Sequence, residues 1–383
     1  MHLLRLSLSQ DKCNRIHIGR QKGQCQNLKV HEANMKESEL EKYLGDLINA
    51  LGDINDTVEQ RVSRGYAVIA EIRAIFSEIP LGRHKVEIGM ELRQAMLLNG
   101  ILFNSEAWHG VYLKHVNEFE KLDEHLLRFI LGAHPKTPCE MLYLESGAIP
   151  IRFVLASRRV NYYVNIMKRN DSELTKRIVK EQVQNPLEGD FFSLVKKDCQ
   201  SLDIPLQRLD TESQKSLKKF VKQQVMKAAT VYLKEKQQKH SKVRNIEYNE
   251  VKTQEYLKSE KITEKESKLL FSLRTRTVAG VKANFPGMFV DTHCPFECVD
   301  KDGIPMPDTQ EHMLDCERQA SLDKTIDPLR SVKYDDIFSK NCDKMKQAAN
   351  MFARLLETRN NLMNQTSEPN AGPEHSASSA VVT

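Results

Sequence analysis

The stretch DTVEQRVSRGYAVIAEIRAIF, residues 56–76, sets the structural character of the chain. Its apolar side chains recur at steps of three and four residues, which is the spacing of one face of an α-helix. The positions that follow this period are Val58, Val62, Tyr66, Ile69, Ile72 and Phe76. The stretch therefore predicts a long amphipathic helix with one buried face and one charged face.

The same helical period continues downstream of this stretch. Pro80 and Gly82 interrupt the first helix, because proline and glycine are the strongest helix breakers. Further helices are predicted over about 85–104 and 114–131, and another begins near Arg152. Short connections between amphipathic helices are typical of a helical bundle. We therefore predict a bundle over residues 56–170.

The composition agrees with a mainly α-helical fold. Of the 383 residues, 28% are charged, 40% are hydrophobic and only 7% are aromatic, which is typical of a helix-rich protein with a polar surface. Residues 1–55 differ, because short alternating runs such as RIHIG (residues 15–19) predict a small α/β segment there. No run of about 18 apolar residues occurs, so we expect no membrane partner. We also find no export signal, which favours a nuclear or cytoplasmic location.

One segment is strongly basic, although the net charge of the chain is only +5. Between Gln214 and Arg244 the chain has ten lysines and arginines against one acidic residue, Glu235. Such a segment can neutralise nucleic-acid phosphates, but it can also be a solvated helix kept soluble by lysine. Only Phe220 and Tyr232 are aromatic here, so the segment favours contacts with the phosphate backbone and not base stacking.

Three cysteines and a histidine gather in a short window with the spacing Cys294-x3-Cys298-x13-His312-x3-Cys316. Two close ligand pairs joined by a loop suit a tetrahedral zinc site, and four protein ligands would make it structural. We therefore predict zinc on Cys294, Cys298, His312 and Cys316. Two alternatives remain: His293 is a competing ligand, or the window holds three buried thiols and no metal.

Motifs of common enzyme classes are missing from the sequence. There is no glycine-rich phosphate loop, no G-x-S-x-G and no H-E-x-x-H. The acidic pair Asp335 and Asp336 is more typical of a helix start than of a metal site. We therefore predict no catalytic residue and no small-molecule substrate.

Several segments, in order, resemble the C-terminal part of a reverse transcriptase from a non-LTR (LINE-type) retrotransposon. The segments EKYLGDLI (41–48), NGILFNSEAWHGV (99–111), LDEHLLRFILGAHPKTPCEMLYLESGAIPIR (122–152) and RRVNYY (158–163) resemble its palm–thumb junction and thumb. LLFSLRTRTVAGVKANF (269–285) and the window that follows resemble its cysteine–histidine module. The resemblance covers roughly residues 5–360 and does not indicate the clade.

The sequence patterns and the resemblance together predict an organisation in six parts. They are a palm remnant (1–55), a helical thumb-like bundle (56–170), a basic helical region (171–290), a zinc-type module (291–320), a C-terminal helix (321–363) and a disordered tail (364–383).

The resemblance also argues against polymerase activity in this chain alone. Such polymerases bind two magnesium ions with a palm aspartate and a Tyr/Phe-x-Asp-Asp box. That box is expected upstream of the first residue here, and Tyr334-Asp335-Asp336 lacks the intervening residue. We expect no magnesium site and no enzymatic activity. An incomplete gene model of a full RNA-directed DNA polymerase is an alternative explanation.

The family's thumb and module hold a template–primer duplex, so the resemblance implies non-specific binding to RNA or an RNA–DNA hybrid. The candidate phosphate-binding residues are Arg61, Arg64, Arg93, Arg128, Arg152, Arg158, Arg159, Lys218, Lys219, Lys222, Arg274, Arg276 and Lys282. The alternative is an inert or protein-interaction fragment, in which these cations pair with acids and Ile16, Ile18, Tyr43 and Leu44 mark a lost partner surface. A continuous basic groove would favour nucleic-acid binding, and cations paired with acids would favour the alternative.

Overall fold

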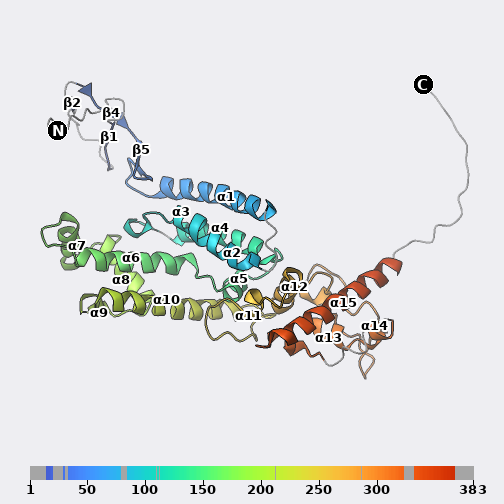
Figure 1. Cartoon of the computed structure of the whole chain (residues 1–383). Coiled ribbons are helices and arrows are strands. Elements are labelled where there is room, and N and C mark those ends of the chain that lie inside the picture. The colour runs from blue at the N-terminus through green and yellow to red at the C-terminus, as the bar shows by residue number, and fades with distance from the viewer. Residues whose placement is uncertain are drawn as a thin grey trace, which may run out of the picture. The chain divides into compact units, whose positions relative to one another are not determined.

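The chain is mainly helical in a computed structural model, as predicted (Figure 1). Two compact units are present, Met1–Glu260 and Lys261–Thr383, and each is described by itself. The structure describes residues 14–19, 29–30, 33–78, 84–108, 110–111, 113–211, 213–285, 287–322 and 332–366. Most of the predicted tail, residues 367–383, and much of the N-terminal segment lie outside the described residues.

The first unit begins with short strand pairs, which agree with the β-like runs in the sequence. The strands are β1 (Asn14–Ile16), β2 (Lys29–Val30), β3 (Ala33–Asn34), β4 (Lys36–Ser38), β5 (Leu40–Tyr43) and β6 (Asp46–Asn49). β1 pairs in parallel with β4, whereas β2–β3 and β5–β6 are antiparallel. Leu44 and Gly45 join β5 to β6 with φ values of 48° and 94°, which suits a tight hairpin turn. Tyr43 and Leu44 are exposed beside this turn.

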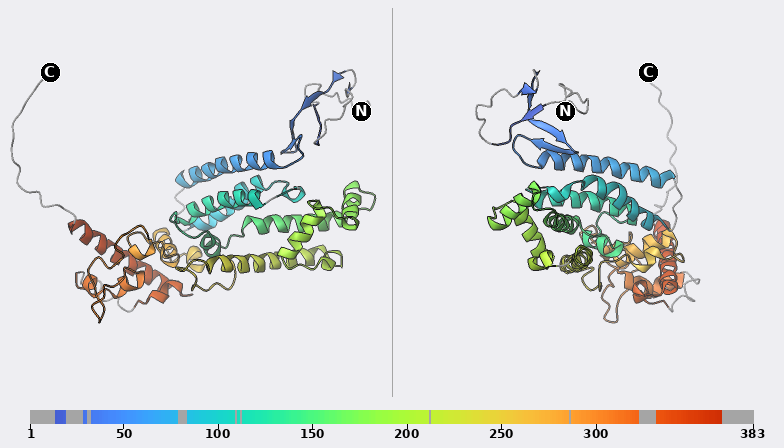
Figure 2. Two further views of the ribbon diagram at one scale, coloured as in Figure 1. Left: turned by 180° about the vertical axis from the view of Figure 1, so that it is seen from behind. Right: turned by 60° about the vertical axis from the view of Figure 1, so that its left-hand side comes forward.

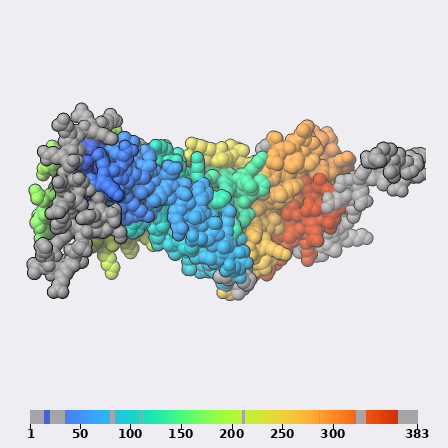
Figure 3. Space-filling model, turned by 90° about the horizontal axis from the view of Figure 1, so that it is seen from above, coloured from blue at the N-terminus to red at the C-terminus, as the bar shows by residue number. Residues whose placement is uncertain are grey.

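The stretch quoted first forms helix α1 (Asn55–Glu78). Val58, Ile69 and Ile72 are buried as predicted, whereas Tyr66 is 51% exposed. The buried face is centred on Gly65 instead, where a Cβ atom would lie 2.2 Å from Leu122 Cδ2. Close approach to α4 (Leu113–Leu131) therefore requires glycine at this position. The opposite face of α1 is open to solvent, as the space-filling view shows (Figure 3).

The predicted helix over 85–104 is not a single α-helix. It consists of α2 (Lys85–Leu92), a π-helical segment η4 (Arg93–Leu98) and α3 (Asn99–Ile101). The segment ends at Asn104, whose φ of 61° is left-handed. After the short 3-10 helix η5 (Ser105–Ala107), Trp108 is buried and stacks on Phe119 with ring centroids 5.9 Å apart.

The remaining helices of the first unit pack around α6 (Ile151–Met167). They are α5 (Cys139–Ser146), α7 (Leu174–Gln184), α8 (Phe191–Ser201), α9 (Leu206–Thr211), α10 (Gln214–Gln237) and α11 (Glu255–Lys258). α6 lies against both α8 and α10, and two views show α6 and α10 side by side (Figures 1 and 2). Ser213 caps α10, and Leu217, Val221, Val225 and Leu233 are buried along one face of the helix. The lysines of α10 consequently lie on the solvent-exposed faces of the helix.

The second unit contains the cysteine–histidine window and the last helix. Its helices are α12 (Glu264–Arg274), η6 (Lys282–Asn284), α13 (Gln310–Asp315), α14 (Glu317–Leu322), η8 (Tyr334–Phe338) and α15 (Cys342–Thr366). Helix α12 begins with a capping box formed by Thr263 and Glu266. It ends at Arg274, and Arg276 is left-handed with φ 55°.

Candidate metal centre and nucleic-acid interface

Backbone hydrogen bonds bring the first pair of cysteines together. Cys294 N donates to Met306 O and Met306 N donates to Cys298 O, both at 2.8 Å, so the loop between the ligand pairs folds back on itself. Glu297 N donates to Cys294 O at 3.0 Å, and Glu297 is left-handed with φ 52°. This tight turn places Cys294 and Cys298 close to the same point.

The second ligand pair lies on and directly after the short helix α13. The Thr309 hydroxyl accepts a hydrogen bond from His312 N at 3.0 Å and so begins the helix, and Cys316 follows its last residue. Residues four apart on a helical turn share one face, which brings His312 and Cys316 together. The sequence spacing predicted this arrangement.

The four side chains form a cluster that could hold a metal ion. One ligand atom from each of Cys294, Cys298, His312 and Cys316 lies within 4.8 Å of the others. The Sγ atom of Cys316 is 4.0 Å from that of Cys294 and 3.5 Å from that of Cys298. Tetrahedral coordination with metal–sulfur bonds of about 2.3 Å would place the sulfurs about 3.8 Å apart. The sulfur–sulfur distances therefore fit tetrahedral coordination of a metal ion.

The polar atoms around the cluster also fit a bound cation. His312 Nε2 is buried without a hydrogen-bond partner in the described part of the chain, and burying such an atom unsatisfied is unfavourable. Burial lowers the pKa of His312, which favours the neutral imidazole that binds metals. Cys316 Sγ accepts a hydrogen bond from Gln319 N at 3.4 Å.

The competing ligand His293 is placed outside the cluster. Its ring is exposed, and Nδ1 lies 2.7 Å from Asp291 Oδ1. Of the pair Asp335 and Asp336, the Asp336 side chain accepts a hydrogen bond through Oδ2 from Lys333 N at 2.8 Å near the start of η8. This contact is of the helix-start kind that the sequence analysis favoured for the pair.

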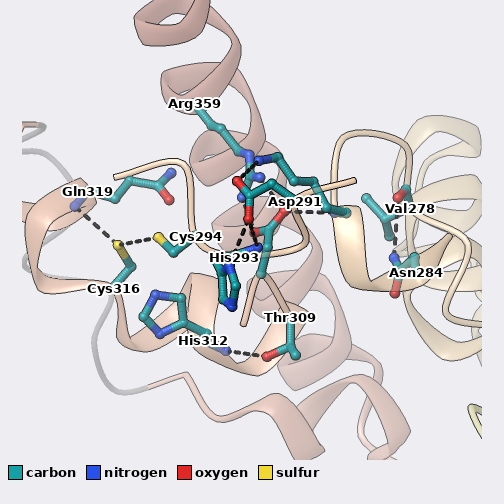
Figure 4. Close-up of polar contacts among 12 residues, drawn as sticks. Val278, Asn284, Asp291, His293, Cys294, Thr309, His312, Cys316, Gln319 and Arg359 are labelled. Atoms are coloured by element: carbon teal, nitrogen blue, oxygen red, sulfur yellow. Dashed lines mark hydrogen bonds and ion pairs between the residues drawn. The ribbon is translucent and has the colours of Figure 1, made fainter. Parts of the chain in front are cut away.

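Helix α15 contacts the residues that flank the second ligand pair, and Figure 4 shows the Arg359 side chain extending from this helix toward the cluster. Arg359 binds Asp308 through two hydrogen bonds of 2.7 and 2.5 Å, and the two side chains are only 2% and 1% exposed. Gln319 Nε2 donates to Leu355 O at 2.5 Å. Asp308 lies four residues before His312, and Gln319 lies three residues after Cys316. Helix α15 therefore binds the chain on both sides of the second ligand pair in sequence.

Five candidate phosphate-binding arginines of the first unit are paired with acids, and the pairs of Arg93, Arg152 and Arg159 are the shortest, at 2.5–2.6 Å. Arg93 donates to Asp123 at 2.6 and 2.7 Å, and both side chains are buried. Although burial by itself lowers the pKa of Arg93, the Asp123 carboxylate outweighs it and raises that pKa. Arg152 donates to Glu120 at 2.8 and 2.5 Å.

The third of these short pairs joins Arg159 to Asp198 at 2.6 Å. Three arginines other than these bind backbone carbonyls. Arg128 donates to Thr137 O at 2.8 Å and Arg158 to Leu102 O at 2.5 Å. Arg61 donates to Gly45 O at 2.9 Å as well as to the Asp46 carboxylate at 3.0 Å.

Arg64 differs from the other arginines of the bundle. Its side chain is 63% exposed, and its ion pair with Glu71 is 3.6 Å long. An exposed pair of this length contributes little to stability.

The candidate cations of the second unit are likewise engaged. Arg274 is buried and donates to Ile337 O at 3.0 Å. Arg276 binds the Glu311 carboxylate through two hydrogen bonds, and Lys282 Nζ lies 3.1 Å from Asp291.

The lysines of α10 have a different environment. Lys218, Lys219 and Lys222 are exposed, and none of them forms an ion pair within the described residues. Lys227 and Lys234 share these properties. The last two were not among the candidates from the sequence, although they belong to the same basic segment and carried the same signal.

These lysines line three adjoining hollows along α10. The first, of about 550 Å³, contains Arg158, Lys218 and Lys222, and the second, of about 720 Å³, contains Lys219, Lys222, Lys227 and Lys234. The third, of about 480 Å³, contains Lys227. Neighbouring hollows share Lys222 or Lys227, so they form one continuous surface. Cations outnumber acids in the first two hollows, which contain Glu106 and Glu250, whereas Asp203 and Glu235 balance the cations of the third.

Comparison of the chain with models of protein families, with curated proteins and with solved structures finds no match. Within the described residues, no helix combines the length and apolar character needed to cross a bilayer.

Proposed function

We propose that this chain binds the phosphate backbone of RNA or of an RNA–DNA hybrid through the lysines of α10. The observation that carries the proposal is the continuous surface formed by Lys218, Lys219, Lys222, Lys227 and Lys234, which have no acidic partners in the described residues. A cation that is already paired with a carboxylate gains little free energy by binding a phosphate. The paired arginines of the bundle therefore contribute less to nucleic-acid binding than the α10 lysines. Backbone contacts of this kind do not read sequence.

The length of the surface suits an extended strand. Lys218 and Lys234 are sixteen residues apart, which is about 24 Å along a helix axis. Each phosphate that a lysine neutralises releases condensed counterions, which favours binding at low salt. Binding should therefore be tight at low ionic strength and weak at high ionic strength.

We further propose that the chain derives from a non-LTR retrotransposon reverse transcriptase and works in the nucleus or cytoplasm. The resembling segments and the basic surface support this ancestry. Because the aspartate box is missing from the sequence, the chain would hold a strand without extending it. Magnesium-dependent addition of a nucleotide to a primer by the purified chain would contradict this part of the proposal.

The cysteine–histidine cluster would hold zinc in a structural role. Three sulfurs and one imidazole are the donor set that zinc prefers, and four protein ligands leave no open position for a substrate. The ion would supply folding energy to the module and the residues directly before it, in which Met288, Phe289, Val290, Val299 and Ile304 are exposed and do not form a core.

The binding proposal is tested with four lysines changed together. Fluorescence anisotropy of a labelled RNA–DNA hybrid is measured at 50 mM salt with the wild-type chain and with Lys218→Gln, Lys219→Gln, Lys222→Gln and Lys227→Gln combined. We expect the variant to bind at least about tenfold more weakly, because four phosphate contacts are lost.

A matched control removes the same charge elsewhere. Arg169, Lys180, Lys261 and Lys268 have side chains that are at least partly exposed and are paired with acids outside the hollows, and their combined change to glutamine should leave affinity within about threefold of wild type. Equal losses in the two variants would show that only net charge matters. No binding at 50 mM salt would contradict the proposal.

A protein-interaction role is the second candidate, and exposed apolar residues near the N-terminus favour it. Ile18, Tyr43 and Leu44 are 55%, 64% and 72% exposed. If these residues form an interface, Tyr43→Ser with Leu44→Ser should abolish a partner complex and leave hybrid binding unchanged.

A further inference from the structure

The third hollow along α10 differs in character from the two lysine-lined hollows beside it. Its volume is about 480 Å³, and its walls come from α6, from the turn after α8 and from α10. Most of its exposed lining is apolar or aromatic and comes from Phe153, Leu202, Ala228, Val231 and Tyr232, and its charged lining residues are Arg152, Lys227, Asp203 and Glu235. A hollow of this size and lining is typical of a pocket for a small flat ligand.

The aromatic wall of this pocket is held in place by neighbouring side chains. The rings of Phe153 and Tyr232 meet edge to face, with centroids 5.6 Å apart and an interplanar angle of 73°. The guanidinium of Arg152 lies 4.5 Å from the Tyr232 ring centre and is itself fixed by Glu120. The wall is therefore preorganised, which lowers the entropic cost of binding a ligand there.

The pocket adjoins the lysine-lined surface directly. Lys227 and Val231 line both this pocket and the 720 Å³ hollow that contains Lys219, Lys222 and Lys234. A group bound in the pocket would therefore be next to several unpaired ammonium groups. This combination matches a nucleotide, which joins a flat base to an anionic phosphate.

We propose that this pocket receives an unpaired nucleobase while the flanking phosphates lie on the α10 lysines, so that the chain prefers single-stranded RNA or DNA to a duplex. The inference rests on the proposed function and specifies its ligand. Bases in a duplex are paired and stacked, so moving one of them into a pocket costs the free energy of unpairing and unstacking. This cost is smaller for a base in a single strand. The mainly apolar lining would accept different bases, as stacking sites generally do.

Sequence reasoning missed this pocket for a physical reason. The basic segment contains only two aromatic residues, which argued against base contacts. The structure adds Phe153 from α6, about eighty residues upstream of Tyr232 in the chain. An aromatic surface assembled from two helices leaves no local pattern.

The test compares an intact single strand with an abasic one. A labelled 12-mer and the same sugar–phosphate backbone without bases carry identical charge, and both are titrated with the full chain at 50 mM salt. We expect the intact strand to bind about fivefold or more tightly, which corresponds to the lower end of measured single-base stacking. A duplex of the same length should bind more weakly than the intact strand.

A pocket variant adds a second, independent readout. Ala228→Leu would fill the pocket without changing charge, and we expect it to abolish the difference between intact and abasic strands while abasic binding stays at the wild-type level. Gln223→Leu, on the same helix outside the pocket, is the matched control and should keep the difference. Equal affinity of the wild-type chain for both strands would overturn the pocket proposal alone, whereas no binding to either strand would overturn the proposed function.

Discussion

Individual arginines of the bundle stabilise the fold and are not free to bind phosphate. Arg93 is the clearest case, because it forms two hydrogen bonds with Asp123 in a fully buried site and a third, of 3.2 Å, with Ile149 O. Removing one partner of such a pair leaves the other charge buried without compensation. Arg93 therefore stabilises the fold, and its guanidinium is not accessible to a phosphate group.

The first prediction concerns this pair. Asp123→Ala should lower the free energy of unfolding by about 3–5 kcal/mol, because the Arg93 guanidinium stays buried without its partner. Urea denaturation followed by circular dichroism measures the change. Arg64→Ala removes an exposed pair and should cost less than about 1 kcal/mol. Similar losses in the two variants would show that the Arg93 pair contributes no more than a surface contact.

The second prediction concerns Gly147, which has a φ of 76° at the end of α5. A Cβ atom at this position would lie 2.3 Å from Thr253 N, so alanine would meet both backbone strain and a clash. Gly189 has a similar φ of 85° with no atom within 4 Å, and Gly189→Ala should cost about 1 kcal/mol. Gly147→Ala should cost clearly more in the same denaturation assay. Equal costs would exclude the close approach of residues 252–253.

Local patterns at the residue scale could be read from the sequence, whereas partners distant in the chain could not. The cluster of Cys294, Cys298, His312 and Cys316 was predicted because each ligand pair is formed within one turn. Arg93 and Lys222 look alike in the sequence, since both are basic residues in predicted helices. Only the packing of α4 places Asp123 against Arg93, and no acid does so for Lys222 within the described residues.

Among the elements, α15 connects the C-terminal helix with the candidate metal centre. Arg359 binds Asp308 on one side of the second ligand pair, and the Leu355 carbonyl accepts from Gln319 on the other. Groups that orient metal ligands from outside commonly alter metal affinity by 10–100-fold when they are removed. Docking of α15 and metal binding should therefore depend on each other.

The third prediction follows from this coupling. Arg359→Met should weaken metal binding by about 10–100-fold, measured by competition between the chain and a chromophoric zinc chelator. Arg354→Met changes an exposed residue of the same helix and should leave the affinity unchanged. If the two variants hold zinc equally well, α15 has no part in forming the centre.

Boundaries of elements were less predictable than their existence. The period of apolar residues indicated α1, α4 and the start of α6 to within a few residues. It did not show that residues 93–98 form a π-helical segment, which begins at Arg93, the residue that binds Asp123 of another helix. Nor did it show that α12 ends at Arg274, where Ile337 O and the Phe338 ring engage the guanidinium.

For the whole molecule, the proposed nucleic-acid binding depends on where the cations lie and not on the net charge of the chain. The net charge of +5 is mild, yet α10 of the first unit presents seven exposed lysines without acidic partners in the described residues, and five of them line the hollows. The second unit carries the candidate metal cluster, and its candidate cations are engaged in hydrogen bonds and ion pairs. The division of the chain into six parts stays a prediction, as does its ancestry.

The most direct test of the account is the salt dependence of binding to a single-stranded oligonucleotide. Five phosphate contacts predict a slope of about −3.5 in a plot of log affinity against log salt concentration. The variant that lacks Lys218, Lys219, Lys222 and Lys227 should have a slope reduced in magnitude by about 3. Equal slopes for the wild-type chain and the variant would show that nucleic acid does not bind on α10.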